Sequence, residues 1–181
     1  MNEKSIPLKR ATFAVLLTLL LSAVGVTNAT AQTFTLGNLN YSLNNDGASV
    51  TVIGHVDGTA ATGELVIPES VELYGTTYPV TVIGDNAFNN CHNLTGSLVI
   101  PNSVITIGDH AFQNCNGFTG LLIIGDAVQI IGYSAFRSCS GFTDLTLGNS
   151  VQSIYEEAFG YFSGFCGELT IPERLTYTTY D

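Results

Sequence analysis

The chain has no tryptophan and very little positive charge. Of its five basic residues, three lie in the first ten positions. From residue 32 onward there is no lysine, and two arginines face fourteen acidic residues, which gives a net charge of −12. Proteins bind phosphate backbones and anionic lipid headgroups through clustered Lys and Arg. The composition therefore argues against nucleic-acid and peripheral membrane binding, and we interpret the acidic surface as a source of solubility rather than as a site for a basic ligand.

The N-terminal region has the pattern of an export signal. Lys4, Lys9 and Arg10 precede an apolar run over residues 11–26, and Ala29-Thr30-Ala31 fits the small-residue pattern of a signal-peptidase site. We expect residues 1–31 to be removed, so that the mature chain begins at Gln32. A membrane anchor is the weaker alternative, because the run is shorter than the roughly 20 apolar residues of a membrane span.

No cysteine occurs before Cys91, which excludes a lipid-modified cysteine at this cleavage point. The sequence thus predicts a protein that is secreted or held at the cell surface without a lipid-anchor cysteine.

Most of the remaining chain is a short unit written several times. Phe88, Phe112, Phe136 and Phe159 each follow an alanine, and the gaps between them are 24, 24 and 23 residues. Isoleucines stand five residues before each of these rings. A period in the twenties is typical of a solenoid, whose units bury their apolar sides by stacking on one another. We predict a solenoid of about four repeats over residues 63–173.

Each unit contains one apolar triplet with alternating side chains, such as Leu98-Val-Ile100 and Leu122-Ile-Ile124. Alternation is the period of a strand with one buried face. Stacked at one per repeat, five such triplets predict a short-stranded parallel sheet on one side of the coil. The Gly-x-x-Ala-Phe segments predict tight turns and a single turn of 3₁₀ or α-helix on the other side.

The two ends of the solenoid need covers. Residues 32–62 form the predicted N-terminal cap, with small antiparallel strands over residues 33–56 joined by the turn Asn44-Asn45-Asp46-Gly47. Residues 174–181 are a tail too short to cover a coil. We therefore expect either a truncated chain or an open end that another copy of the chain closes.

The residues from Leu98 to Cys115 combine Ile-Pro-x-Ser-Val, Ile-Gly-x-x-Ala-Phe and Cys. This combination resembles the repeat of the BspA-like leucine-rich-repeat proteins, and the resemblance covers residues 63–173. It implies a bacterial surface or secreted protein that binds other proteins, in some members extracellular-matrix or plasma proteins or other cells. The chain departs from the widespread leucine-rich-repeat pattern because no asparagine ladder follows the strand.

Cys91, Cys115 and Cys139 occupy one repeat position, and the equivalent position in the next unit is Phe162. Since a site that accepts phenylalanine is a packing site, we assign these three cysteines, with the four repeated phenylalanines, to the structural core. Free thiols are favoured. A disulfide between neighbouring coils stays open, because equivalent Cα atoms lie at roughly the 5–6 Å that a bridge needs.

The sequence offers no catalytic, metal or cofactor site. His55, His92 and His110 lie at unrelated repeat positions, and there is neither a Cys-x-x-Cys pair nor a nucleophile elbow. We therefore predict a protein that is not an enzyme and needs no cofactor.

The outward residues of the predicted sheet are the candidate protein-binding site. The apolar members cluster mid-sheet with acidic residues around them: Val66, Val99, Leu121 and Ile123, with Glu64, Asp144 and Glu168. The competing interpretation is that Val and Ile are simply good strand formers. The inserted stretch over residues 72–79 carries Tyr74 and Tyr78, which would either contact a ligand from a protruding hairpin or roof the first coil.

Together these features predict an extracellular protein that binds a protein ligand in adhesion, such as a host protein or another cell surface. The alternative is a structural spacer or a homo-oligomer that stacks through an open C-terminal coil.

Overall fold

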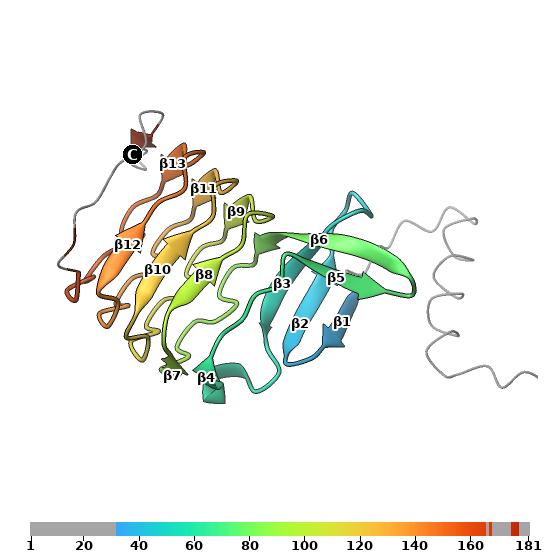
Figure 1. Ribbon diagram of the computed structural model, residues 1–181, viewed down its shortest axis with the longest axis horizontal. Helices are drawn as coiled ribbons and strands as arrows, with labels where there is room; N and C mark the ends of the chain where they lie inside the picture. The colour runs from blue at the N-terminus through green and yellow to red at the C-terminus, as the bar shows by residue number, and fades with distance from the viewer. Residues whose placement is uncertain (1–31, 166, 168–174, 178–181) are drawn as a thin grey trace, which may run out of the picture. The chain divides into compact units, whose positions relative to one another are not determined.

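The computed structural model describes residues 32–165, 167 and 175–177. They belong to one compact unit, residues 31–181; the predicted signal peptide, residues 1–31, lies outside the described residues. Within the described part there is no α-helix, and no helix there is long and apolar enough to cross a membrane. Short strands follow one another along the coil, and longer antiparallel strands precede them (Figure 1).

The described residues form fourteen strands and one 3₁₀ turn. In chain order the elements are β1 (Thr33–Leu36), β2 (Leu39–Leu43), β3 (Val50–His55), η1 (Gly58–Ala60), β4 (Thr62–Glu64), β5 (Ser70–Leu73), β6 (Thr76–Ile83), β7 (Asn93–Thr95), β8 (Leu98–Ile100), β9 (Thr106–Ile107), β10 (Leu121–Ile124), β11 (Ile130–Ile131), β12 (Asp144–Thr146), β13 (Ser153–Ile154) and β14 (Thr176–Tyr177).

The N-terminal strands confirm the predicted antiparallel cap. β1 pairs with β2 and β2 with β3, both antiparallel. In the turn between β2 and β3, Asp46 accepts hydrogen bonds from the backbone N–H groups of Ala48 and Ser49 at 2.8 and 3.0 Å, and the bond from Ala48 is the main reason that the pKa of the Asp46 carboxyl is lowered. β3 then pairs in parallel with β6, so the cap and the solenoid share one continuous sheet.

The predicted parallel sheet is present as the strand order β12-β10-β8. In register, Leu122 lies between Leu98 and Leu145, and all three side chains are buried. The alternating triplets therefore form the expected strands, with one face on the core.

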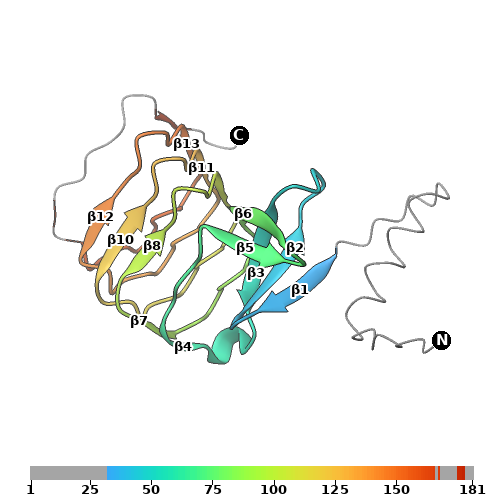
Figure 2. The ribbon, with the colours of Figure 1, turned by 45° about the vertical axis from the view of Figure 1, so that its right-hand side comes forward.

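A second parallel sheet was not predicted. It consists of β6, β9, β11, β13 and β14, and its registers place Ile83, Ile107, Ile131 and Ile154 in one row. The first three of these isoleucines are fully buried. The two parallel sheets lie on different sides of the coil, as the views in Figures 1 and 2 show.

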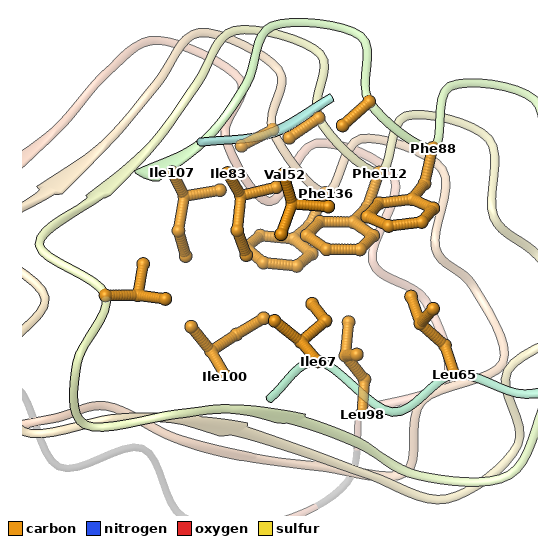
Figure 3. Packing of buried hydrophobic residues seen from close by; sticks show 14 of the residues in the cluster. Val52, Leu65, Ile67, Ile83, Phe88, Leu98, Ile100, Ile107, Phe112 and Phe136 are labelled. Atoms are coloured by element: carbon orange, nitrogen blue, oxygen red, sulfur yellow. The ribbon is translucent and has the colours of Figure 1, made fainter. Parts of the chain in front are cut away.

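The first coil departs from the regular pattern. Leu65 and Ile67 are buried and point toward the phenylalanines (Figure 3), but residues 65–67 form no strand. The strand of this coil is instead β4, which pairs in parallel with β7. The expected single sheet of five triplets thus has three strands in the described residues, and the fifth triplet, residues 169–171, lies outside them.

Stacked rings fill the interior. Phe112 lies between Phe88 and Phe136, with 5.1 Å between ring centroids on either side and interplanar angles of 8° and 4°. Figure 3 shows these three rings stacked in the interior, where they are fully buried. Phe159, whose ring centroid lies 5.5 Å from that of Phe136, is partly buried. The expected core therefore runs along the coil axis and becomes more exposed at Phe159.

Turns occupy the Gly-x-x-Ala-Phe segments, and the expected single turn of 3₁₀ or α-helix is not formed there. Asn86, His110, Ser134 and Glu157 sit at one repeat position and have φ between 52° and 58°. A Cβ on Gly132 would lie 2.7 Å from the carbonyl carbon of Gly108, so this glycine lets neighbouring coils approach closely.

Side chains also join one coil to the next. Asp85 accepts the backbone N–H of Asp109, Asp109 accepts that of Tyr133, and the amide of Asn114 donates to Asn90. The partners in each of these bonds are 24 residues apart. We call this set the inter-coil bonds.

Candidate binding surface

The outward side of the β12-β10-β8 sheet and the first coil expose a group of apolar side chains. Val66 is 72% exposed, Val99 52% and Leu121 45%, and Ile123 is half-buried. Val99 and Ile123 are paired in register on adjacent strands. We call Val66, Val99, Leu121 and Ile123 the apolar patch. The structure thus places Val99, Leu121 and Ile123 on this sheet, while Val66 belongs to the irregular first coil.

A shallow groove of about 350 Å³ crosses the strand ends of this sheet. Val99 and Ile123 line it, together with the residues that follow the strands, among them Pro101, Gly125 and Gly148. A Cβ on Gly125 would lie 2.7 Å from two carbonyl oxygens of the preceding coil. The glycine therefore allows the two neighbouring coils to stack closely where they line the groove.

Acidic side chains border the patch. Glu69 and Asp126 line the same groove, and Asp144 is in register with Leu121. Asp126 accepts hydrogen bonds from the backbone N–H and the side-chain amide of Asn149, both at 3.1 Å. These bonds hold its carboxylate at the rim. The predicted neighbour Glu168 lies outside the described residues.

The inserted stretch forms the hairpin β5–β6, and it separates the two tyrosines. Tyr74 lies at its tip with φ 52° and is 62% exposed. Tyr78 is partly buried and packs against the core. Neither tyrosine is among the described residues that line the groove. Tyr78 therefore roofs the first coil, and only Tyr74 is placed where it could meet a ligand.

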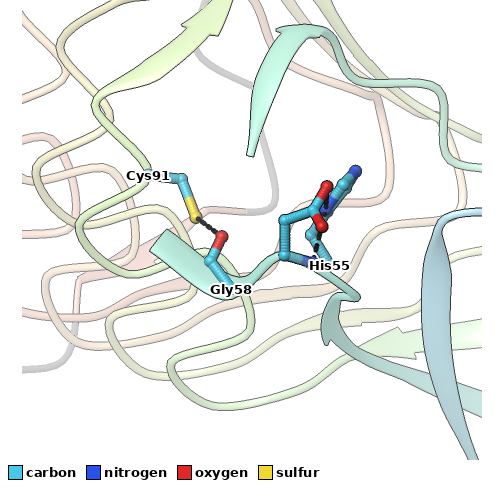
Figure 4. Close-up of polar contacts among 4 residues, drawn as sticks. His55, Gly58 and Cys91 are labelled. Atoms are coloured by element: carbon cyan, nitrogen blue, oxygen red, sulfur yellow. Dashed lines mark hydrogen bonds and ion pairs between the residues drawn. The ribbon is translucent and has the colours of Figure 1, made fainter. Parts of the chain in front are cut away.

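The three repeated cysteines are free and buried. The thiols of Cys91, Cys115 and Cys139 donate to the carbonyl oxygens of Gly58, Phe88 and Phe112, at 3.3, 2.9 and 3.0 Å; Figure 4 shows the first of these bonds. Burial raises the pKa of all three thiols, that of Cys139 to about 12. They are therefore protonated hydrogen-bond donors. Cys166 lies outside the described residues.

The histidines do not converge. His55 is buried in the cap, where its Nδ1 accepts the backbone N–H of Asp57 at 3.1 Å (Figure 4). His110 packs edge-on against Tyr133, with 5.3 Å between ring centroids, and His92 is exposed. No group of three or more potential metal ligands occurs among the described residues.

The outward row of the second sheet is a feature that sequence reasoning missed. Register places hydroxyl and apolar side chains side by side across it: Thr51, Val82, Thr106, Ile130 and Ser153. The sequence signal for this row was the residue directly before each repeated isoleucine. In a strand, the neighbour of an inward residue points outward.

Comparison with protein families gives one match. The model of the BspA type leucine rich repeat region matches residues 69–181 with six copies. A comparison with curated proteins found no match.

Several solved structures are similar. A leucine-rich repeat protein from Bacteroides ovatus ATCC 8483 is 29% identical, with a TM-score of 0.66; the match covers 81% of this chain and 37% of that one. A leucine rich cell surface protein from Faecalibacterium prausnitzii A2-165 is 25% identical, with a TM-score of 0.55, over 83% of this chain and 51% of that one. The T. pallidum leucine rich repeat protein shares the fold, at 23% identity and a TM-score of 0.67, over 82% of this chain and 64% of that one.

The chain thus spans about half or less of the length of the first two of these relatives.

Proposed function

The chain belongs to the BspA-type leucine-rich repeat proteins, and from that premise we propose that it is exported and binds a protein ligand at or outside the cell surface. The apolar patch and its groove are the proposed contact surface, with Tyr74 as an outlying contact. The proposal includes no catalytic step and no cofactor. Adhesion to a host extracellular protein or to another cell is the biological role that it suggests.

The observation behind this proposal is the exposure of the apolar patch. Val66 and Val99 are 72% and 52% exposed, although the residues on either side of each valine are buried. An apolar surface bordered by charged side chains is typical of interaction sites. The similar F. prausnitzii structure is that of a leucine rich cell surface protein, which agrees with a role at the cell surface.

The size of the face limits its affinity. The three strands of the described sheet, about 4.8 Å apart, offer on the order of 150–200 Å², against roughly 800 Å² per partner in a stable interface. We expect weak binding at a single sheet. Useful attachment would come from the neighbouring loops or from many copies on one surface acting together.

The direct test compares two isoleucine substitutions. Ile123→Glu places a charge in the apolar patch, whereas Ile130→Glu places the same charge on the outward face of the second sheet, where Ile130 is 37% exposed. Capture of a panel of extracellular-matrix and plasma proteins is measured for both variants and for the wild type. Loss of capture in Ile123→Glu alone supports the proposal, and unchanged capture in that variant removes the patch as the site.

Export has its own test. Expression in a bacterium that secretes through the general pathway is expected to yield a protein whose N-terminal residue is Gln32, as read by mass spectrometry. An intact N-terminus on the exported protein would contradict the assigned cleavage site.

Self-assembly is the second candidate. Phe159, Phe162 and Phe165 are only partly buried, unlike the fully buried rings earlier in the stack, and this gradient favours an interface at the C-terminal coil. The predicted contact residues Leu169 and Ile171 lie outside the described residues. Light scattering over a tenfold concentration range distinguishes the candidates: a discrete dimer or a growing series supports assembly, and a constant monomer mass rejects it.

A further inference from the structure

The acidic residues around the apolar patch lie on two opposite borders. Because the strands of the sheet are parallel, the residues that precede them share one edge and the residues that follow them share the other. Asp144 is the first residue of β12 and Glu64 the last of β4, two residues before Val66. Glu69 and Asp126 lie at the groove beyond the other ends of the strands. The apolar patch is therefore bordered by carboxylates on both edges.

No basic side chain neutralises these carboxylates in the part of the chain that the structure describes. Among the described residues, Arg137 is the one lysine or arginine. Its Nε lies 2.7 Å from a carboxylate oxygen of Glu157, and its guanidinium carbon lies 4.9 Å from the centroid of the Tyr161 ring. These partners lie in the turn over residues 156–161, so the arginine is occupied away from the patch.

We propose that the apolar patch binds a basic amphipathic peptide segment of a partner protein, an inference that rests on the proposed function and specifies its ligand. For the carboxylates at this patch, it replaces the sequence-based interpretation that acidic residues serve solubility alone. Apolar side chains of the segment cover Val99 and Ile123. Lysine or arginine side chains flanking them reach Glu69 and Asp126 on one border and Asp144 and Glu64 on the other. Complementary charge raises the association rate and discriminates against acidic partners.

The dimensions set the length of the segment. The patch residues lie in three coils. At a spacing of about 4.8 Å they give a patch about 10 Å long, which corresponds to roughly six residues of α-helix at 1.5 Å per residue. About two helical turns present one apolar stripe along the patch. A longer segment would extend beyond the described face.

The test uses three synthetic peptides of about twelve residues with the same leucine pattern and with Lys, Gln or Glu at the polar positions. Binding to the purified protein is followed by fluorescence anisotropy at low and at high salt. The Lys peptide is expected to bind more tightly than the Gln peptide, and the Glu peptide more weakly than both. Raising the salt concentration is expected to remove most of the difference, because exposed charges are screened.

Two double variants remove the same amount of charge from different places. Glu69→Gln with Asp126→Asn neutralises the border of the groove, and Asp126→Asn retains an oxygen that can accept from Asn149. Asp85→Asn with Glu156→Gln neutralises exposed positions on the turns. The border variant is expected to bind the Lys peptide about five- to tenfold more weakly, and the turn variant to bind it nearly as the wild type does.

The outcomes separate this inference from the proposed function. Equal weakening by both double variants would show non-specific attraction to net charge and overturn the inference. If the Lys and Gln peptides bind equally and Ile123→Glu abolishes both, the patch is a binding site without a preference for basic ligands, so the inference fails while the proposed function stands. If no peptide binds and the protein-capture panel is also insensitive to Ile123→Glu, both fail.

Discussion

The two parallel sheets of the solenoid come from the same repeats but differ in their outward rows. In the β12-β10-β8 sheet, Val99 and Ile123 lie side by side with Leu121 next to them. In the second sheet, Thr106 separates Val82 from Ile130. The inward residues of β8, β10 and β12 and those of β6, β9 and β11 are buried leucine, isoleucine or valine, and Ile154 of β13 is partly buried. Packing therefore determines the inward residues of both sheets equally, and only the outward residues are free to differ for a function.

The largest expected effect comes from the interior that both sheets share. Phe112→Ala should destabilise the protein by about 3–5 kcal/mol, because it removes a fully buried ring that is stacked on both faces. Phe159→Ala is the matched control and should cost less, since that ring is only partly buried. Urea unfolding followed by circular dichroism measures both. Equal costs would mean that the stack is uniform along the coil.

The buried thiols make the shared interior sensitive to high pH. Burial raises the pKa of Cys139 from 9.0 to about 12 and also raises that of Cys115. Between about pH 9 and pH 12 the Cys139 thiol is deprotonated in the unfolded chain but still protonated in the folded chain. The free energy of unfolding therefore keeps its full value below about pH 9 and decreases as the pH rises. The loss is on the order of 1 kcal/mol for each thiol by pH 10.

Unfolding by urea at a series of pH values measures this slope. Cys115→Ala combined with Cys139→Ala should flatten it even though the variant is less stable at neutral pH. A slope that is unchanged in the double variant would assign the pH sensitivity to other groups, such as Tyr41, whose pKa is also raised by burial.

A glycine substitution should affect the second sheet more than the first. Gly132 follows β11 directly, and a Cβ there would meet the backbone of the preceding coil at 2.7–2.8 Å. Gly132→Ala should cost about 1–3 kcal/mol through overpacking. Hydrogen exchange is expected to show faster exchange at β9 and β11 than at β8 and β10. Uniform loss of protection would mean that the two sheets unfold as one unit.

The smallest expected effect on stability concerns the outward rows themselves. Ile123→Glu and Ile130→Glu should each change the free energy of unfolding by about 0.5 kcal/mol or less, because both side chains already face solvent in part. Because the two variants should be about equally stable, a difference in their binding can be assigned to the position of the charge. A loss of several times that amount in Ile123→Glu would mean that its binding defect reports misfolding.

The sequence predicted the features that recur at long, visible intervals. The spacing of Phe88, Phe112 and Phe136 identified the stack, and the alternation over residues 98–100 identified the first sheet. The sequence did not reveal the second sheet, because strands such as Thr106–Ile107 are two residues long. So short a strand shows no alternation of its own. Their pairing depends on the neighbouring coils rather than on local pattern.

The first coil shows a different limit. Leu65 to Ile67 has the same alternation as the later triplets, and its inward side chains are buried, yet the strand of this coil is β4. Side-chain pattern reports which residues face the core, whereas strand pairing also depends on the backbone path into the β5–β6 hairpin. The candidate site could be located from the outward residues, but the arrangement of its acidic borders required the register of the sheet.

The inter-coil bonds bear on how such a chain can change in length. Each of those bonds joins residues 24 positions apart, so duplicating a whole 24-residue unit within a gene would recreate every contact without inventing a new interface. Deleting a unit would likewise rejoin compatible surfaces. Genetic recombination between neighbouring repeats could therefore lengthen or shorten the protein while its fold is retained, and selection could then act on the outward residues of each added coil separately.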